Sequence, residues 1–216
     1  MKTRNAFTLV ELMVALMLFG FMSAAMASIY ATANRHLFQD YRGNMVKGNV
    51  TVAMRAIGNV MAQATSINAP GTNAKGNILT VASNVDQLTG CYPLKSGLPV
   101  TLYKFCASGS DFYYGFKTFW PAAGCVSPLS GCCGALAYPS GCGSGGGATW
   151  IKLLPGSLDT TSNIFSRKAA EKVNDLMSVR VGLTGKWTPP GNLATLQRTV
   201  TFTLDSTFSV SRSNSN

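Results

Sequence analysis

Charged residues and histidine are both scarce in this sequence. Asp, Glu, Lys and Arg make up only 12% of the 216 residues, about half of the usual share, and His36 is the single histidine. The acidic residues are scattered, so neither a carboxylate pair nor a calcium-binding loop is visible. A nucleophilic Gly-x-Ser-x-Gly turn and a phosphate-binding loop are absent as well. The absence of these motifs predicts a protein that is not an enzyme and that holds no metal or cofactor.

Proline is missing from residues 7–69, and charge is missing from Leu12 to Asn34. The uncharged run is long enough to cross ~30 Å of hydrocarbon as a helix. Because no proline interrupts this region, we expect one helix of ~55 residues, about 80 Å long at the usual rise per residue. Residues 7–34 would form its transmembrane half, and residues 35–69 would form an amphipathic half outside the membrane.

The expected amphipathic half carries a regular apolar stripe. Its members recur in steps of three and four residues, which places them on one face of a helix. They are Val46, Val50, Ala53, Met54, Ile57, Val60, Met61 and Ala64. A stripe of this kind needs a partner surface that covers it, and the rest of the chain has to supply that surface.

Residues 70–216 have the composition of a β-rich domain. Short segments rich in β-branched and aromatic residues predict strands at 77–83, 100–105, 112–119, 149–154, 176–185 and 198–212. In the last of these, Val200, Phe202 and Leu204 alternate with threonines, which is typical of a half-buried antiparallel strand. The predicted fold is therefore α+β, with one long helix packed on an antiparallel sheet.

Cysteine occurs only in the middle of the chain. The six residues are Cys91, Cys106, Cys125, Cys132, Cys133 and Cys142. If the apolar N-terminal run directs export, an even number of cysteines predicts disulfides, and six thiols allow 15 pairings among which the sequence does not choose. A metal cluster is the alternative, but the spacing lacks the short paired gaps of zinc sites. We expect residues 121–148 to form a disulfide-held loop, with separate partners for the adjacent Cys132 and Cys133.

The beginning of the apolar run contains one carboxylate, Glu11. A charged side chain within hydrocarbon costs roughly 2.5–3.5 kcal/mol on insertion scales. A signal peptide offers one interpretation of this region, with Lys2 and Arg4 before an apolar segment and a small-residue cleavage site at Ala25–Ala27. An uncleaved anchor is another. Neither explains the acid, because both would be served better by an apolar residue.

The stretch AFTLVELMVALMLFG, starting at Ala6, resembles the N-terminal signal of type IV pilins and of the pseudopilins of type II secretion. The resemblance implies a leader of residues 1–6, cleavage between Ala6 and Phe7 by prepilin peptidase, and N-methylation of Phe7. Ala6 stands where this family normally has glycine. Glu11 then becomes the fifth residue of the processed chain and pairs with the terminal ammonium of a neighbouring subunit. Such pairing penalises any register that leaves the charge alone.

The same resemblance implies a pilin-like ladle fold and a structural role. The chain would be a single-pass inner-membrane protein that assembles with other pilin subunits into a filament outside that membrane, as part of a type IV pilus or a secretion filament. The large domain and the cysteine-rich loop favour a minor subunit. The terminal strands, with Arg198 before the last one, loosely resemble PilW-type or J-type minor pilins. A secreted protein released near Ala27 is the alternative.

Two binding roles are also compatible with the sequence. The formal net charge is +10, which would favour nucleic acid or another polyanion. A basic and aromatic surface for DNA could be formed by Lys95, Lys104, Lys117 and Lys152 with Tyr103, Tyr113 and Trp120. Positive charge is only a prerequisite for DNA binding, and aromatic residues in strands pack in the core by default. The cysteine-rich loop could instead serve in adhesion.

Overall fold

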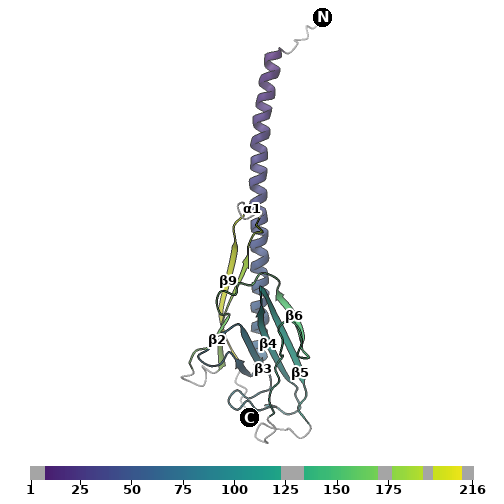
Figure 1. Ribbon diagram of the computed structural model, residues 1–216, viewed down its shortest axis with the longest axis vertical. Helices are drawn as coiled ribbons and strands as arrows, with labels where there is room; N and C mark the ends of the chain where they lie inside the picture. Colours follow the sequence, from purple (N-terminus) through teal and green to yellow (C-terminus); the bar gives the residue numbers. More distant parts are fainter. Residues whose placement is uncertain (1–7, 123–133, 170–176, 192–196, 211–216) are drawn as a thin grey trace.

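The fold is a long helix whose second half is covered by two antiparallel sheets. The structure is a computed structural model, and it describes residues 8–122, 134–169, 177–191 and 197–210. The first half of the helix projects from the domain toward the N-terminus, and the strands surround the second half (Figure 1). The predicted α+β ladle is confirmed.

Helix α1 spans Leu9–Gln63, 55 residues. Thr8 is its N-cap, and the cap residue at the other end, Ala64, is extended and donates its N–H to the carbonyl of Val60 at 2.9 Å. The helix therefore ends at Gln63 and not near residue 69 as predicted. The residues that follow enter a strand, because their backbone groups pair with a neighbouring strand of the sheet.

The first sheet has the order β1-β3-β4-β5-β6. Its strands are β1 (Ser66–Ala69), β3 (Ile78–Ala82), β4 (Val100–Ser108), β5 (Asp111–Phe119) and β6 (Thr149–Leu154). The second sheet has the order β2-β7-β8-β9, with β2 (Lys75–Gly76), β7 (Phe165–Ser166), β8 (Ser178–Trp187) and β9 (Val200–Ser209). Every strand that was predicted is present, and the short β1, β2 and β7 were not predicted.

The apolar stripe of α1 is the centre of the core. All eight predicted members are buried, from fully buried Val50 and Ile57 to Met54 at 8% exposure. Both sheets reach the helix, through β8 and β9 on one side and through β6 on the other. The stripe prediction is confirmed.

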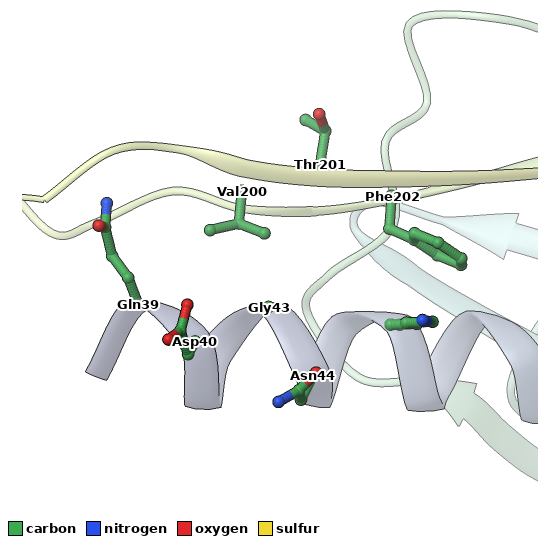
Figure 2. Close-up of a pocket in the computed structure, with 8 residues that line it drawn as sticks. Gln39, Asp40, Gly43, Asn44, Val200, Thr201 and Phe202 are labelled. Atoms are coloured by element: carbon green, nitrogen blue, oxygen red, sulfur yellow. The ribbon is translucent and has the colours of Figure 1, made fainter. Parts of the chain in front are cut away.

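Strand β9 lies along the helix and runs in the same direction. A Cβ built on Gly43 would lie 3.7 Å from Val200 Cγ1, and one built on Gly58 would lie 3.1 Å from the ring of Phe208. Val200, the first residue of β9, therefore lies beside Gly43 (Figure 2), whereas the end of β9 lies beside the later Gly58. The chain before Val200 points toward the exposed apolar half of α1.

The five-stranded sheet is covered on both faces. Its inner face packs on α1, whereas a second apolar cluster lies on the outer face. That cluster consists of Ala82, Val85, Val100 and Leu102, with Tyr92, Phe119, Leu136 and Tyr138 packed against it. Residues from the segment after β3 and from the segment before β6 therefore cover the outer face of the sheet. This arrangement gives the cysteine-rich loop an apolar base.

Candidate functional site

The first half of α1 is an apolar surface with no partner inside the fold. It contains an 18-residue window that is long and apolar enough to cross a membrane, and 0% of that window is buried. Phe21 is 76% exposed and Ile29 is 68% exposed. A core helix of a soluble domain would be buried at such positions. The exposed half of the helix is therefore the candidate surface for membrane anchoring and for assembly.

Glu11 lies in the first turn of this helix, where it forms a capping box with Thr8. The backbone N–H and the hydroxyl of Thr8 each donate to Glu11 Oε2 at 3.0 Å, and the N–H of Glu11 donates to Thr8 Oγ1 at 3.3 Å. The carboxylate thus has partners within its own chain, and it also complements the positive end of the helix dipole. The intermolecular role predicted for Glu11 stays a prediction.

Thr8 was missed in the sequence analysis, although its signal was present. A threonine followed three residues later by glutamate and an apolar run is the usual pattern of a capping box. Ala6 and Phe7, the predicted cleavage residues, lie outside the described residues. The cleavage position is therefore not tested by the structure.

The N-terminal region of the chain matches a family model. Residues 1–27 match the family model described as the prokaryotic N-terminal methylation motif. No curated protein and no solved structure matches the chain at a significant level of similarity. The motif indicates a type IV pilin-like or pseudopilin precursor, and it implies processing by prepilin peptidase and assembly with other pilin subunits. The helix that carries the motif is consistent with membrane anchoring before assembly.

The cysteine-rich segment is attached to the outer face of the five-stranded sheet. Cys106 of β4 forms a disulfide with Cys142, with their Cα atoms 6.0 Å apart, and Cys91 is disulfide-bonded as well. This confirms disulfides as the role of these three cysteines. Cys125, Cys132 and Cys133 lie outside the described residues.

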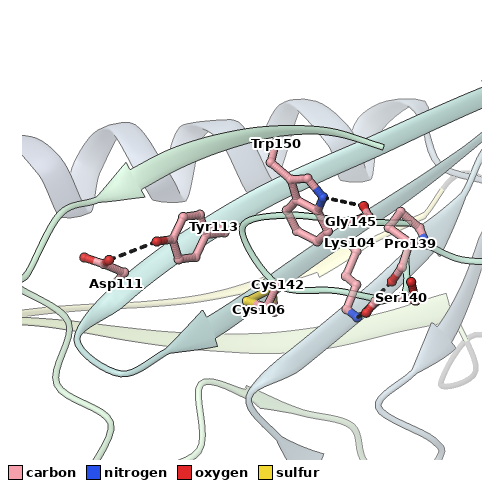
Figure 3. Close-up of a disulfide and its surroundings, with 9 residues drawn as sticks. All are labelled: Lys104, Cys106, Asp111, Tyr113, Pro139, Ser140, Cys142, Gly145 and Trp150. Atoms are coloured by element: carbon pink, nitrogen blue, oxygen red, sulfur yellow. Dashed lines mark hydrogen bonds between the residues drawn. A yellow bond between two sulfur atoms is a disulfide. The ribbon is translucent and has the colours of Figure 1, made fainter. Parts of the chain in front are cut away.

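Two polar side chains hold the same segment in place (Figure 3). Lys104 Nζ donates to the carbonyls of Pro139 at 2.9 Å and Ser140 at 3.3 Å. Trp150 Nε1 donates to the carbonyl of Gly145 at 3.0 Å. Burial lowers the pKa of the Lys104 ammonium. The loop is thus held on the sheet by one disulfide and by hydrogen bonds from two strands, β4 and β6, which flank β5.

The residues suggested for DNA binding do not form one free basic surface. Lys104 donates a hydrogen bond to the carbonyl of Pro139 in the cysteine-rich loop, and Lys152 forms a salt bridge with Asp111 at 2.7 Å. Tyr103 is only 8% exposed and packs in the core. Lys95 is exposed, and Trp120 is exposed as well. The fold therefore uses several of these side chains for its own stability, and DNA binding gains no support from it.

Among the described residues, no group of three or more His, Cys, Asp or Glu side chains could hold a metal ion. His36 is exposed on α1. A groove of about 560 Å³ lies between α1 and the start of β9, and it is lined by Gln39, Asp40, Gly43, Asn44, Lys47, Val200, Thr201 and Phe202 (Figure 2). The groove lining combines one carboxylate and one ammonium with apolar and amide side chains.

The pKa of Asp111 should report how the β4–β5 hairpin is fastened to β6. The carboxylate accepts hydrogen bonds from Lys152 Nζ at 2.7 Å, from the N–H of Gly156 at 2.6 Å and from the Tyr113 hydroxyl at 2.9 Å. These bonds, led by that from Lys152, lower the pKa of Asp111 to about 2. The stabilisation is present above the ordinary aspartate pKa and is lost as the pH falls through the lowered value.

A carboxyl carbon NMR titration of the full chain in detergent micelles measures this pKa directly. We expect a midpoint near pH 2 for Asp111. In the Lys152→Gln variant the midpoint should rise toward the ordinary value, because the principal donor and its charge are lost. An unchanged midpoint in that variant would show that Lys152 does not hold the carboxylate in solution.

Proposed function

We propose that this protein is a minor pilin-like structural subunit, cut between Ala6 and Phe7 and assembled through α1 into a type IV pilus or a pilus-like secretion filament. The observation that carries the proposal is the match of residues 1–27 to the methylation motif, at the start of a helix whose first half is exposed and apolar. Glu11 becomes the fifth residue of the processed chain.

The physical basis is that α1 has apolar surface which its own domain does not cover. The domain buries only the stripe in the second half of the helix. The first half keeps its large apolar side chains exposed, with Leu16 at 62% and Phe19 at 70% exposure. Lipid covers this surface before assembly, and helices of other subunits cover it in a filament. A subunit with a structural role needs no catalytic group.

A minor role is favoured by the shape of the domain. The disulfide between Cys106 and Cys142 holds an irregular loop on the outer face of the sheet. A major subunit has to repeat its outer surface many times along a filament, and an irregular loop suits a position that occurs once or a few times. The proposal places the chain in the inner membrane before assembly and in an external filament afterwards.

The mature N-terminus tests this proposal. Intact mass spectrometry of the purified full-length product should show a chain that begins at Phe7 and carries one methyl group. A chain that begins near Ser28 would instead identify a secreted protein released by signal peptidase, and would overturn the proposal. Stoichiometry measured on purified filaments would then distinguish a minor subunit from a major one.

A further inference from the structure

A group of arginines lies where α1 leaves its apolar run. Arg35 follows the last residue of that run, Arg42 is two turns further on, and Arg198 precedes the first residue of β9. Arg35 and Arg198 are exposed. We call these three residues the basic collar. From this arrangement we propose that the basic collar binds the anionic headgroups of phospholipids at the outer surface of the inner membrane.

Helix geometry places Arg35 at the level of the headgroups. A hydrocarbon core of about 30 Å takes about 20 helical residues. Counted from Leu12, the first residue after Glu11, the core ends near Ala31. The headgroup layer adds roughly 5–7 Å on that side, which is about four or five residues. Arg35 therefore lies within this layer.

Arg42 lies on the same face of the helix as Arg35. Seven residues turn an α-helix by about 700°, within about 20° of two full turns. The acidic residue in this region, Asp40, is five positions from Arg35 and therefore about 140° away around the axis. Arg42 lies roughly 9 Å beyond the layer, about one Debye length at physiological salt. The positive charges thus face one side and the carboxylate faces another.

The second sheet holds Arg42 in place and adds Arg198. The guanidinium of Arg42 lies 5.6 Å from the ring centroid of Trp187 and 6.0 Å from that of Tyr41. A cation held by ring faces keeps its N–H donors available for phosphate oxygens. Trp187 pairs with Val200 at the membrane-proximal end of β8 and β9. Because β9 runs away from the membrane, Arg198 lies on the side of Val200 that is closer to the lipid.

Exposed aromatic rings accompany these charges. Tyr30, Phe38 and Tyr41 are 70%, 60% and 64% exposed. Aromatic side chains at the end of a spanning helix prefer the level of the headgroups, because one part of the ring is apolar and another can remain wet. The collar is continuous with the membrane-spanning surface, which makes a lipid surface its partner. Binding of lipid headgroups by the basic collar would fix the height of the domain above the membrane before the subunit leaves the membrane for the filament.

Hydrogen exchange on the full chain tests the basic collar. The protein is reconstituted at low protein-to-lipid ratio in bilayers of phosphatidylcholine alone or with phosphatidylglycerol, and mass spectrometry follows amides of residues 35–42. We expect exchange about tenfold slower with phosphatidylglycerol, and we expect high salt to remove the difference. The Arg35→Gln/Arg42→Gln/Arg198→Gln variant should lose it as well.

The matched control removes the same charge elsewhere. Lys75, Lys95 and Lys168 are exposed and lie outside the basic collar, so their triple replacement by glutamine should keep the lipid effect. Arg35→Gln alone, outside the packed domain, should weaken it without any loss of folding. Equal exchange in both lipids would overturn the proposal, as would protection that grows with protein-to-lipid ratio, which indicates contact between copies.

The proposal rests on membrane anchoring by α1, which the proposed function requires. The two fail in different ways. A mature chain that lacks residues 7–27 would remove the anchor and overturn the proposed function, and mass spectrometry of the same preparation detects it. An intact anchor with exchange that is insensitive to lipid charge would overturn the collar alone.

Discussion

Replacing Gly185 with alanine is expected to destabilise the domain by about 1–3 kcal/mol, the usual cost of overpacking. A Cβ at this position would lie 2.5 Å from Val50 Cγ2 and 2.7 Å from Val46 Cγ1. Both valines are at most 1% exposed and belong to the stripe of α1. Their short side chains have no room to move aside, so β8 and the helix would have to separate. The second sheet depends on this close approach.

Unfolding of the full chain in detergent micelles, followed by tryptophan fluorescence in urea, measures the effect. Gly182→Ala is the matched control, because a Cβ there meets nothing within 4 Å and alanine is favoured over glycine in a strand. Its midpoint should stay the same or rise. Combining Gly185→Ala with Val50→Ala should give less than the sum of the two single losses, since the second change makes room for the new methyl group. Equal midpoints for Gly185→Ala and Gly182→Ala would contradict the close packing.

The helix and the longer strands could be predicted because their signals are local. Val46, Val50 and the other members of the stripe repeat with the period of one helix, and all of them are buried. The alternation in Val200–Ser209 likewise reflects the side-chain period of a strand. The match of the N-terminal segment to the methylation motif is also a property of consecutive residues.

The missed elements depend on partners far away in the sequence. Lys75–Gly76 is a strand only because it pairs with Phe165–Ser166, and nothing within those two residues indicates pairing. The disulfide from Cys106 to Cys142 joins residues 36 positions apart, and 15 pairings were possible. Tertiary contacts decided each of these outcomes.

Lys104 shows how the same limit affected the candidate binding surface. Its sequence position on a strand suggested an exposed cation, but a distant loop covers it and its ammonium bonds to the carbonyl of Pro139. A signal for this cover was present in β4, where Val100, Leu102 and Cys106 make the outer face apolar. Strands that are apolar on both faces are typical of sheets covered on both sides.

Replacing Glu11 is expected to abolish assembly while membrane anchoring remains. The apolar run after this residue is unchanged in Glu11→Ala, so insertion should not fall. If the carboxylate forms an ion pair with the terminal ammonium of a neighbouring subunit, its loss leaves that ammonium buried and unpaired. That loss costs about 3–5 kcal/mol in buried pairs, so incorporation into filaments should fall by roughly a hundredfold or more, at about 1.4 kcal/mol per tenfold. Membrane fractionation and immunodetection on purified filaments measure the two steps separately.

The capping box between Glu11 and Thr8 calls for a second comparison, which separates loss of the charge from loss of the helix cap. Glu11 accepts from the N–H and the hydroxyl of Thr8, so Glu11→Ala removes both a charge and a helix cap. Glu11→Gln keeps an acceptor at the cap and removes only the charge. If charge pairing sets the register, Glu11→Gln should be as defective as Glu11→Ala, and Thr8→Val should assemble nearly as well as the unchanged chain.

The opposite pattern would assign Glu11 to its own helix. Normal incorporation of Glu11→Gln, together with a defect in Thr8→Val, would show that the start of α1 needs its cap and not a charge between subunits. The energies make the two cases separable, because a lost cap costs about 1 kcal/mol whereas an unpaired buried charge costs several. Both Thr8 bonds end on Glu11 Oε2, and a carboxylate has acceptor sites on both of its oxygens. Glu11 can therefore cap its own helix and pair with a neighbour's ammonium, and comparing Glu11→Gln with Thr8→Val shows which of the two interactions assembly requires.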